Sequence, residues 1–187
     1  MLKRVIAYAH ELIEKSVNPG ETVVDGTCGN GNDTLFLSKL VGYEGHVLAF
    51  DVQEQAIENT KELLKEHKAT QNVTLLQESH QFVGNYLKEA TLGGAIFNLG
   101  YLPGSDKTII TKPTSTIQAI DTIATYLKPG GLIVLVVYHG HPGGDHEKSE
   151  LLNYVSGFEQ KKFNVLQYGF INQKNNPPFV LAIEKKV

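Results

Sequence analysis

The residues with the clearest chemical potential lie in the stretch "VVDGTCGNGNDT" (residues 23–34), where an apolar run meets a carboxylate and then a glycine-rich turn. Asp25 ends the apolar run, and Gly29 and Gly31 follow in the turn. Glycines at such a place let the backbone approach a bound molecule closely, and the helix that follows offers free N–H groups. Asp51 ends the next apolar run about 20 residues later, the spacing at which an acidic side chain binds ribose hydroxyls. The pattern predicts a site for a cofactor that contains a nucleoside.

Two classes of cofactor fit this pattern. A dinucleotide would place its pyrophosphate on the turn, but its usual fingerprint is G-x-G-x-x-G, whereas the spacing here is Gly26-x-x-Gly29-x-Gly31. Asp25 would also place a carboxylate beside a doubly negative pyrophosphate, which is unfavourable. S-adenosylmethionine has no phosphate and carries an ammonium and a sulfonium group, so a nearby acid is tolerated. We therefore predict S-adenosylmethionine as the cofactor.

The cofactor-binding residues are expected at the ends of three successive apolar runs. Ser79 and His80 follow the third run, where the adenine edge would be met, although Ser79 could instead cap a helix, as could Asp51. The full predicted set is Asp25, Gly29, Asn30, Gly31, Asn32, Asp51, Gln53, Ser79 and His80.

Apolar runs alternate with helical patterns along the chain. Strands are expected at residues 21–26, 46–52, 73–77, 93–100, 132–138, 163–171 and 178–186. Helices are expected at residues 1–17, 32–41, 53–68, 80–90, 114–127 and 146–160. Five alternating βα units and a terminal antiparallel hairpin predict a single α/β domain over 1–187, with a Rossmann-like, seven-stranded, mostly parallel sheet. In such a sheet ligands bind beyond the carboxyl ends of the strands, where the site residues fall.

The composition and charge narrow the class of protein. The 187 residues are 41% hydrophobic and 20% charged, which is ordinary for one globular domain with a buried core. The net charge of −3 gives no basic field of the kind that dominates many nucleic-acid binders. Cys28 is the only cysteine, which rules out an internal disulfide framework and suits a small buried filler. The amphipathic N-terminal pattern and the lack of a long apolar segment predict a cytoplasmic protein without a membrane span.

The motifs resemble those of class I methyltransferases. "VVDGTCGNG" is similar to their first motif, D-x-G-x-G-x-G, with Thr27 where the first glycine usually stands. "LAFDVQ" resembles their second motif, and "LKPGG" (residues 127–131) resembles the turn before their fifth strand. Together with the expected terminal hairpin, this resemblance covers nearly the whole chain.

A narrower resemblance rests on five short pieces in order: "DGTCGNGNDT", "ESHQ", "FNLGYLPGSDK", "YHGHPGG" and "NPPF". They look like a small bacterial family once labelled rRNA methylase-like and now understood as the tRNA wobble-uridine 5-aminomethyl methyltransferases. The resemblance implies methyl transfer from S-adenosylmethionine to the exocyclic amine of 5-aminomethyl-(2-thio)uridine. It also implies the tRNA anticodon stem-loop as partner.

The acceptor residues follow from the same resemblance. "NLGYLP" (residues 98–103) resembles the loop of amine methyltransferases that is often written Asn or Asp followed by Pro-Pro-Tyr. The Asn98 side-chain oxygen and a carbonyl near Leu99 could accept the hydrogens of the amine, although Asn98 could also be a simple turn former. Tyr101 could stack on the base, and His139 could take a proton. The catalytic prediction is Asn98, Tyr101 and His139, and the predicted substrate-binding residues are Leu99, Gly100, Tyr138, His141 and Pro142.

Other interpretations of the residues stay open. The H-x-H spacing would permit a metal site from His139, His141, Asp145 and His146, although we predict no metal, and the same loop could be a lid that excludes water. Five lysines could meet an RNA backbone or lie on solvated faces: Lys107, Lys112, Lys148, Lys161 and Lys162. The competing functions are an rRNA or small-metabolite methyltransferase and, in another class, a nucleotide-binding dehydrogenase-like module. A homodimer with a composite surface is a further expectation.

Overall fold

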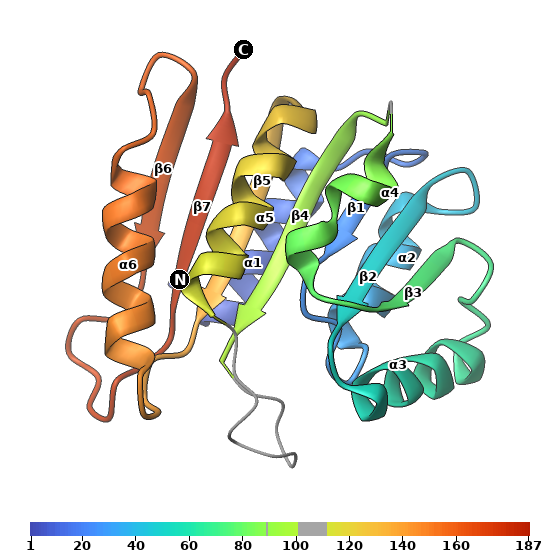
Figure 1. Ribbon diagram of the computed structural model, residues 1–187, viewed down its shortest axis with the longest axis horizontal. Coiled ribbons are helices and arrows are strands. Elements are labelled where there is room, and N and C mark those ends of the chain that lie inside the picture. The colour runs from blue at the N-terminus through green and yellow to red at the C-terminus, as the bar shows by residue number, and fades with distance from the viewer. Residues whose placement is uncertain (89, 101–111) are drawn as a thin grey trace.

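The structure, a computed structural model, describes residues 1–88, 90–100 and 112–187 (Figure 1). In this part of the chain the strands are β1 (Thr22–Asp25), β2 (His46–Asp51), β3 (Val73–Gln77), β4 (Leu92–Leu99), β5 (Leu127–Val137), β6 (Phe163–Tyr168) and β7 (Phe179–Lys185). The helices are α1 (Val5–Ser16), α2 (Asn32–Val41), α3 (Glu54–Glu66), the 3-10 helix η1 (His80–Phe82), α4 (Gly84–Leu87), α5 (Pro113–Tyr126) and α6 (Gly144–Ser156).

The described strands form one seven-stranded sheet in the order β3-β2-β1-β4-β5-β7-β6. The first five strands are mutually parallel, and β7 runs antiparallel to both β5 and β6. This confirms the predicted mostly parallel sheet with a C-terminal antiparallel pair. The strand order reverses between β1 and β4, so the topological switch point lies beside the glycine-rich turn that follows β1.

Helices cover both faces of the sheet. Figure 1 shows α4, α5 and α6 in front of it and α1 and α2 behind it. Alternate residues of the central strands enter two separate cores: Phe97 of β4 and Val137 of β5 pack with α5 and α6, whereas Ile96 and Val136 pack with α1 and α2. The chain therefore buries its central strands on both sides, as their continuous apolar runs predict.

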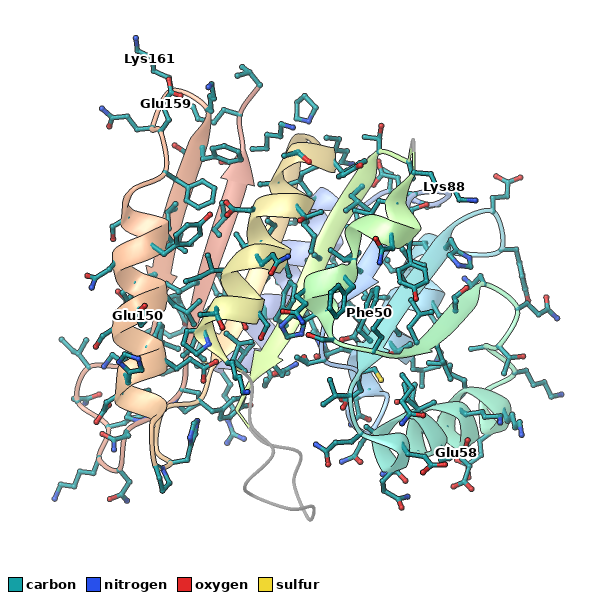
Figure 2. The ribbon with its side chains drawn as sticks, in the orientation of Figure 1. Phe50, Glu58, Lys88, Glu150, Glu159 and Lys161 are labelled. Atoms are coloured by element: carbon teal, nitrogen blue, oxygen red, sulfur yellow. The ribbon has the colours of Figure 1, made fainter. Side chains whose placement is uncertain are left out.

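The side chains follow this layering. Phe50 of β2 is fully buried in the core packed with α4 and α5, whereas Glu58 on α3, Glu150 on α6 and Lys161 before β6 are exposed and point outward (Figure 2). Within the described ranges, no helix combines the length and the apolar character that crossing a membrane requires.

Three expectations about element bounds are wrong. The pieces at 80–90 form a short η1 and a four-residue α4, because Lys88 has a positive φ of 42° and ends the helical path. The helix expected from residue 146 begins at Gly144, after Gly143 in the left-handed region. The segment 127–131 is part of β5, where a register shift places Leu127 opposite Leu92 but Leu132 opposite Gly94.

Candidate functional site

The alternation of side chains along the strands places the two central site residues. Asp25 continues the face of β1 that carries Val23, and Asn98 continues the face of β4 that carries Ile96. Both side chains therefore lie on the side of the sheet covered by α1 and α2. Because β1 and β4 are parallel neighbours, with Asp25 opposite Ile96, their carboxyl ends bring Asp25 and Asn98 to the same edge.

The glycine-rich turn after β1 has the backbone that glycine permits. Gly29 and Gly31 have φ values of 53° and 87°. A Cβ on Gly31 would also lie 2.9 Å from the Thr60 Cα, so any side chain there would push α3 away. The Thr60 hydroxyl donates to the Gly29 carbonyl at 3.1 Å, which fixes the turn against α3.

Asp51 stands at the end of β2 and holds this turn in place. Its two oxygens accept hydrogen bonds from the Gly29 N–H at 3.1 Å and the Gln53 N–H at 3.0 Å. Burial raises the pKa of this carboxyl. A carboxylate has about four acceptor positions, so two remain for the hydroxyls of a ribose. The alternative that Asp51 caps the helix expected at residues 53–68 is wrong, because the N-cap of this helix, α3, is Gln53.

Asp25 lies deeper than the other candidates. It is fully buried and accepts hydrogen bonds from the Thr34 hydroxyl at 2.6 Å and the Thr27 N–H at 3.1 Å. Burial, together with the negative charge of Asp33, raises the pKa of Asp25 to about 8. A buried acid at this point favours a cofactor with positive groups over a pyrophosphate.

The raised pKa of Asp25 predicts a pH dependence of stability. Below about pH 4 the carboxyl is protonated in both the folded and the unfolded chain. Between about pH 4 and pH 8 only the folded chain keeps the proton, so the free energy of unfolding falls as pH rises, by up to roughly 1.4 kcal/mol per pH unit from this group. Asp25→Asn should flatten this fall, since its amide can still accept from Thr27 and donate to the Thr34 hydroxyl.

Urea unfolding of the wild type and Asp25→Asn at several pH values between 4 and 8 measures this effect. Glu44→Gln is the matched control, because Glu44 is an exposed carboxylate away from the turn. Parallel curves for the wild type and Asp25→Asn would show that Asp25 keeps an ordinary acidity in the fold.

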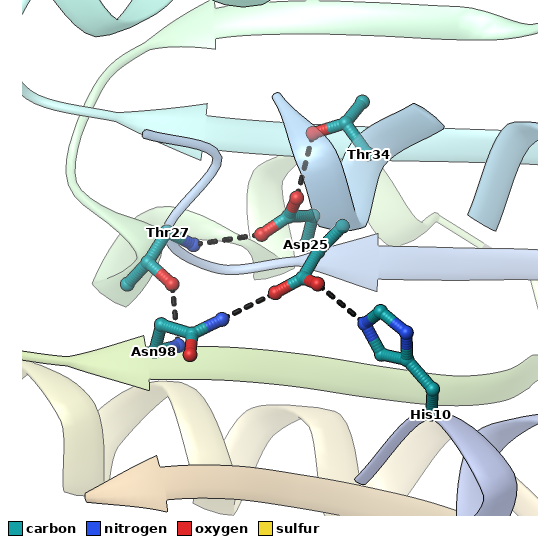
Figure 3. A network of polar contacts seen from close by, with 6 residues as sticks. His10, Asp25, Thr27, Thr34 and Asn98 are labelled. Atoms are coloured by element: carbon teal, nitrogen blue, oxygen red, sulfur yellow. Dashed lines mark hydrogen bonds and ion pairs between the residues drawn. The ribbon is translucent and has the colours of Figure 1, made fainter. Parts of the chain in front are cut away.

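Asn98 belongs to a polar network that spans three elements, shown from close by in Figure 3. Its Nδ2 donates a short hydrogen bond to Asp33 in the first turn of α2. The other oxygen of Asp33 lies 2.6 Å from His10 Nε2 on α1. The backbone N–H of Asn98 donates to the Thr27 hydroxyl at 2.6 Å. The network ties the end of β4 to the turn after β1 and to the N-terminal helix.

Thr27 explains the departure from the usual glycine pattern of the first motif. A glycine at this place could not accept the hydrogen bond from the Asn98 N–H, which the Thr27 hydroxyl does. The preceding Gly26 shows the opposite requirement, because a Cβ there would lie 2.1 Å from the Phe97 ring. Gly26 therefore allows the turn to pack closely against Phe97 of β4, and Thr27 binds the end of the same strand through the Asn98 N–H.

His80 supports the turn from within the core. Its Nδ1 lies 2.8 Å from the Gly26 carbonyl, so Nδ1 carries the proton and donates, and its Nε2 faces the Thr116 hydroxyl at 3.4 Å. Burial lowers the pKa of His80, which favours the neutral ring. The His80 side chain thus binds the Gly26 carbonyl. Ser79 caps η1, because its hydroxyl accepts a hydrogen bond from the Gln81 N–H. The capping alternative for Ser79 is confirmed.

The remaining residues of the predicted cofactor set surround the turn. Asn32 begins α2, after Gly31 at its N-cap. The Asn30 side chain accepts a hydrogen bond from Asn59 of α3 at 2.9 Å and is exposed. Gln53 donates its backbone N–H to Asp51 and leaves its side chain partly exposed. The structure thus brings the predicted turn residues and Asp51 together in one place.

The predicted acceptor residues meet at the ends of β4 and β5. Leu99 is buried, and its carbonyl accepts the N–H of Tyr138 at 3.1 Å. Gly100 lies against Tyr138, since a Cβ there would be 3.3 Å from the Tyr138 Cβ. Tyr138 follows β5 two residues after Val136, whose side chain lies on the α1 and α2 side of the sheet, as does that of Asn98. Burial and the charge of Asp33 raise the pKa of Tyr138. Tyr101 and Lys107 lie outside the described residues.

Tyr138 and His139 follow β5 one after the other, and successive residues of an extended segment point to opposite faces. The His139 ring is buried against Phe179 of β7. Its Nδ1 lies 3.3 Å from Asp145, and its Nε2 lies 3.2 Å from the Pro177 carbonyl. These contacts join the loop after β5 to the segment before β7, and they occupy both ring nitrogens.

His141 and Pro142 lie in the loop between β5 and α6. The partly exposed His141 ring lies close to the carbonyls of Tyr138 and Pro142, at 2.9 Å and 3.1 Å, and so folds back on its own loop. Among the residues that the structure describes, no group of three or more His, Cys, Asp or Glu side chains could hold a metal ion.

The site residues predicted from the sequence do not include His10 and Asp33. Both carried a signal: Asp33 follows the turn directly in "GNGNDT", and His10 interrupts the apolar face of α1 between Ala9 and Ile13. The contact between them joins residues far apart in the chain, and no local pattern indicates it.

Comparisons with known proteins identify the family of this chain. The model of the family described as "Putative rRNA methylase" matches residues 47–184, and that of the protein-L-isoaspartate(D-aspartate) O-methyltransferases matches residues 3–83. A chloroplastic tRNA (mnm(5)s(2)U34)-methyltransferase from Arabidopsis thaliana is 38% identical over 193 residues, which cover 98% of this chain and 70% of the relative.

Solved structures give the same result. A Clostridium thermocellum protein named as an rRNA methylase is 43% identical, with a TM-score of 0.96 over 99% of each chain. A Streptococcus mutans protein named as a methyltransferase and solved in complex with SAH is 42% identical, with a TM-score of 0.91 over 99% of each chain. The family match spans most of this chain, and the Arabidopsis relative spans nearly all of it. The chain therefore belongs to this rRNA methylase family, a family of class I methyltransferases.

Proposed function

We propose that the chain transfers a methyl group from S-adenosylmethionine to the amine of 5-aminomethyl-(2-thio)uridine at the tRNA wobble position. The observation that carries this proposal is the Asn98 side chain, whose amide is held at its NH₂ end by Asp33. Its oxygen is left to accept a hydrogen bond at the carboxyl edge of the sheet. The Arabidopsis relative, named for the wobble nucleoside mnm(5)s(2)U34, supports the choice of substrate.

The residues present fit S-adenosylmethionine. Asp51 would bind the ribose hydroxyls, and the turn from Gly29 to Asn32 would lie against the methionine end. The carboxylates of Asp33 and Asp51 suit the positive ammonium and sulfonium groups. When bound, S-adenosylmethionine supplies an electrophilic methyl group on a sulfonium sulfur.

The task of the protein is then to present a neutral amine in line with that methyl group. The amine nitrogen uses its lone pair to form the new bond to the methyl carbon. The carbon–sulfur bond breaks with its electron pair on sulfur, and the amine releases one proton to solvent. Asn98 Oδ1 accepts one hydrogen of the amine and thereby directs the lone pair away from itself.

The acceptor base would have to leave its stack to reach this edge. RNA-binding proteins usually take such bases from single-stranded loops, and an anticodon wobble base meets that need. Tyr138 follows β5, the neighbour of β4 in the sheet, and its exposed side chain offers a ring on which a base could rest. The net charge of −3 implies few phosphate contacts and a modest dependence of binding on salt.

Methylation should depend on the amine that tRNA already carries. We expect the purified protein to transfer labelled methyl from S-adenosylmethionine to tRNA that bears 5-aminomethyluridine or its 2-thio form. Unmodified transcript should receive no label, because uridine lacks the nucleophile. Mass spectrometry of the digested nucleosides identifies the product as the 5-methylaminomethyl form.

The same assay separates the competing functions. Label in the unmodified transcript, or no label in the aminomethyl tRNA, would remove the proposal. Ribosomal RNA, offered in parallel because of the name of the family, would then show whether the chain methylates rRNA. If neither RNA receives label, a small-metabolite acceptor becomes the leading alternative.

Two accompanying proposals concern assembly and place. We propose a homodimer, because two copies would offer a larger surface to tRNA than one, and light scattering of the purified protein tests this. We also propose that the protein works in the cytoplasm, where fluorescence of a tagged copy would be seen.

A further inference from the structure

The Asn98 amide is held by its donor end alone. An ionised carboxylate only accepts hydrogen bonds, so the amide must turn its NH₂ group toward Asp33. Asp33 is nine-tenths buried, which excludes most of the water that could replace this bond. The amide oxygen of Asn98 then points away from the hydrogen bond that the NH₂ group donates, as Figure 3 shows.

Asp33 is itself held from a second direction. His10 Nε2 lies 2.6 Å from the Asp33 oxygen that does not bind Asn98. The His10 ring stacks on Phe36, with centroids 4.1 Å apart and planes at 6°. Because each oxygen of Asp33 has a partner on a different element, the carboxylate cannot turn without breaking one of these contacts.

We propose that Asp33 and His10 are positioning residues, which fix the Asn98 amide so that its oxygen faces the acceptor amine. This inference rests on the proposed function. An amide turned by 180° would present its NH₂ group to the amine, compete for its lone pair and point it away from the methyl group. Asp33 and His10 thus act through Asn98, and α1 takes part in the orientation of the nucleophile.

Exchanging the two side chains tests this directly. Asp33→Asn loses the fixed polarity, because the new amide on α2 can either donate to Asn98 or accept from it. Asn98→Asp places two carboxylates against each other. Each single variant should lower turnover by roughly 10- to 100-fold, with the dissociation constant of S-adenosylmethionine changed by less than about threefold.

The double variant Asp33→Asn/Asn98→Asp should restore part of the activity. The new amide on α2 would accept from His10 and donate to the new carboxylate at the end of β4, so every bond of the network is kept and an oxygen still faces the acceptor. We expect the double variant to turn over at least about tenfold faster than either single variant. A double variant no faster than the singles, or an Asp33→Asn variant with normal turnover, would overturn the inference.

The contribution of His10 has a matched control in the same chain. His46 at the start of β2 is also partly exposed, and its Nε2 lies 2.8 Å from the Thr74 hydroxyl. His10→Ala should lower turnover without changing cofactor affinity, whereas His46→Ala should leave turnover unchanged. Equal turnover in the two variants would remove His10 from the proposal.

A readout without tRNA separates this inference from the proposed function. In protein labelled with ¹⁵N at asparagine side chains, one Asn98 amide proton should be shifted downfield and exchange slowly in the wild type. That signal should be lost in Asp33→Asn and kept in His46→Ala. If the wild type fails to methylate aminomethyl tRNA, the proposed function falls, and this signal still decides whether Asp33 orients Asn98.

Discussion

Asp51→Ala is expected to weaken the binding of S-adenosylmethionine strongly while the chain stays folded. The Asp51 carboxylate uses two acceptor positions on the Gly29 and Gln53 N–H groups and offers the others to the ribose. Charge-assisted hydrogen bonds of this kind contribute roughly 1.5–3 kcal/mol each. Losing both bonds to the ribose corresponds to a weakening of about 10²- to 10⁴-fold.

Calorimetric titration with S-adenosylmethionine measures this loss, and thermal melting checks the fold. Glu54→Ala is the matched control, since it removes an exposed carboxylate from the first turn of α3. It should leave the affinity within about twofold of the wild type, as expected for a surface substitution. Unchanged affinity in Asp51→Ala would contradict the assignment of the ribose hydroxyls to Asp51.

The sheet could be predicted from the sequence because its signals are local. Short apolar runs bounded by glycine and proline mark the strands, and the ten-residue link between 168 and 179 is too short for a helical crossover. The same applies to the positions of Asp25 and Asp51, which follow directly from where apolar runs end. The prediction of element bounds failed where the backbone of a single residue ends a helix. Lys88 ends the helical segment with a positive φ, although lysine is a residue type that helices accept.

The candidate site could be predicted only in part, because some of its contacts are long-range. Asn98 was found from a motif, but its partner Asp33 is 65 residues away in the chain, and His10 lies 23 residues before Asp33. The separation of His139 from Tyr138 could have been found, since the two residues directly follow the apolar run of β5 and side chains alternate in an extended segment. The contacts of Asp33 with Asn98 and His10, which orient the Asn98 amide, can be identified only in the folded structure.

The carboxylates around the turn also bear on how the cofactor is exchanged. Asp25, Asp33 and Asp51 lie within one neighbourhood, and the charge of Asp33 adds to burial in raising the pKa of Asp25. Bound cationic groups of a cofactor would relieve this repulsion. We therefore expect the site to favour the sulfonium cofactor over its neutral demethylated product, which helps the product to leave.

Asn98→Ala is expected to lower turnover by about 10²- to 10³-fold, the size of effect seen when one aligned hydrogen bond to a reacting group is removed. The affinity for S-adenosylmethionine should stay within about threefold of the wild type, because the Asn98 oxygen is needed only when the acceptor amine is bound. The backbone N–H of residue 98 keeps its bond to the Thr27 hydroxyl in the variant, so the end of β4 should hold its place.

Single-turnover methylation of aminomethyl tRNA at saturating cofactor, in parallel with calorimetric titration, separates these two quantities. Asn164→Ala is the matched control, because the Asn164 amide also donates to a carboxylate, that of Glu184 at 2.9 Å, but lies on the edge strand β6. It should leave turnover unchanged. Normal turnover in Asn98→Ala would reduce Asn98 to a turn former at the end of β4. An equal loss of cofactor affinity would instead make it a cofactor-binding residue. Only a loss confined to turnover matches an amide oxygen that directs the lone pair of the amine.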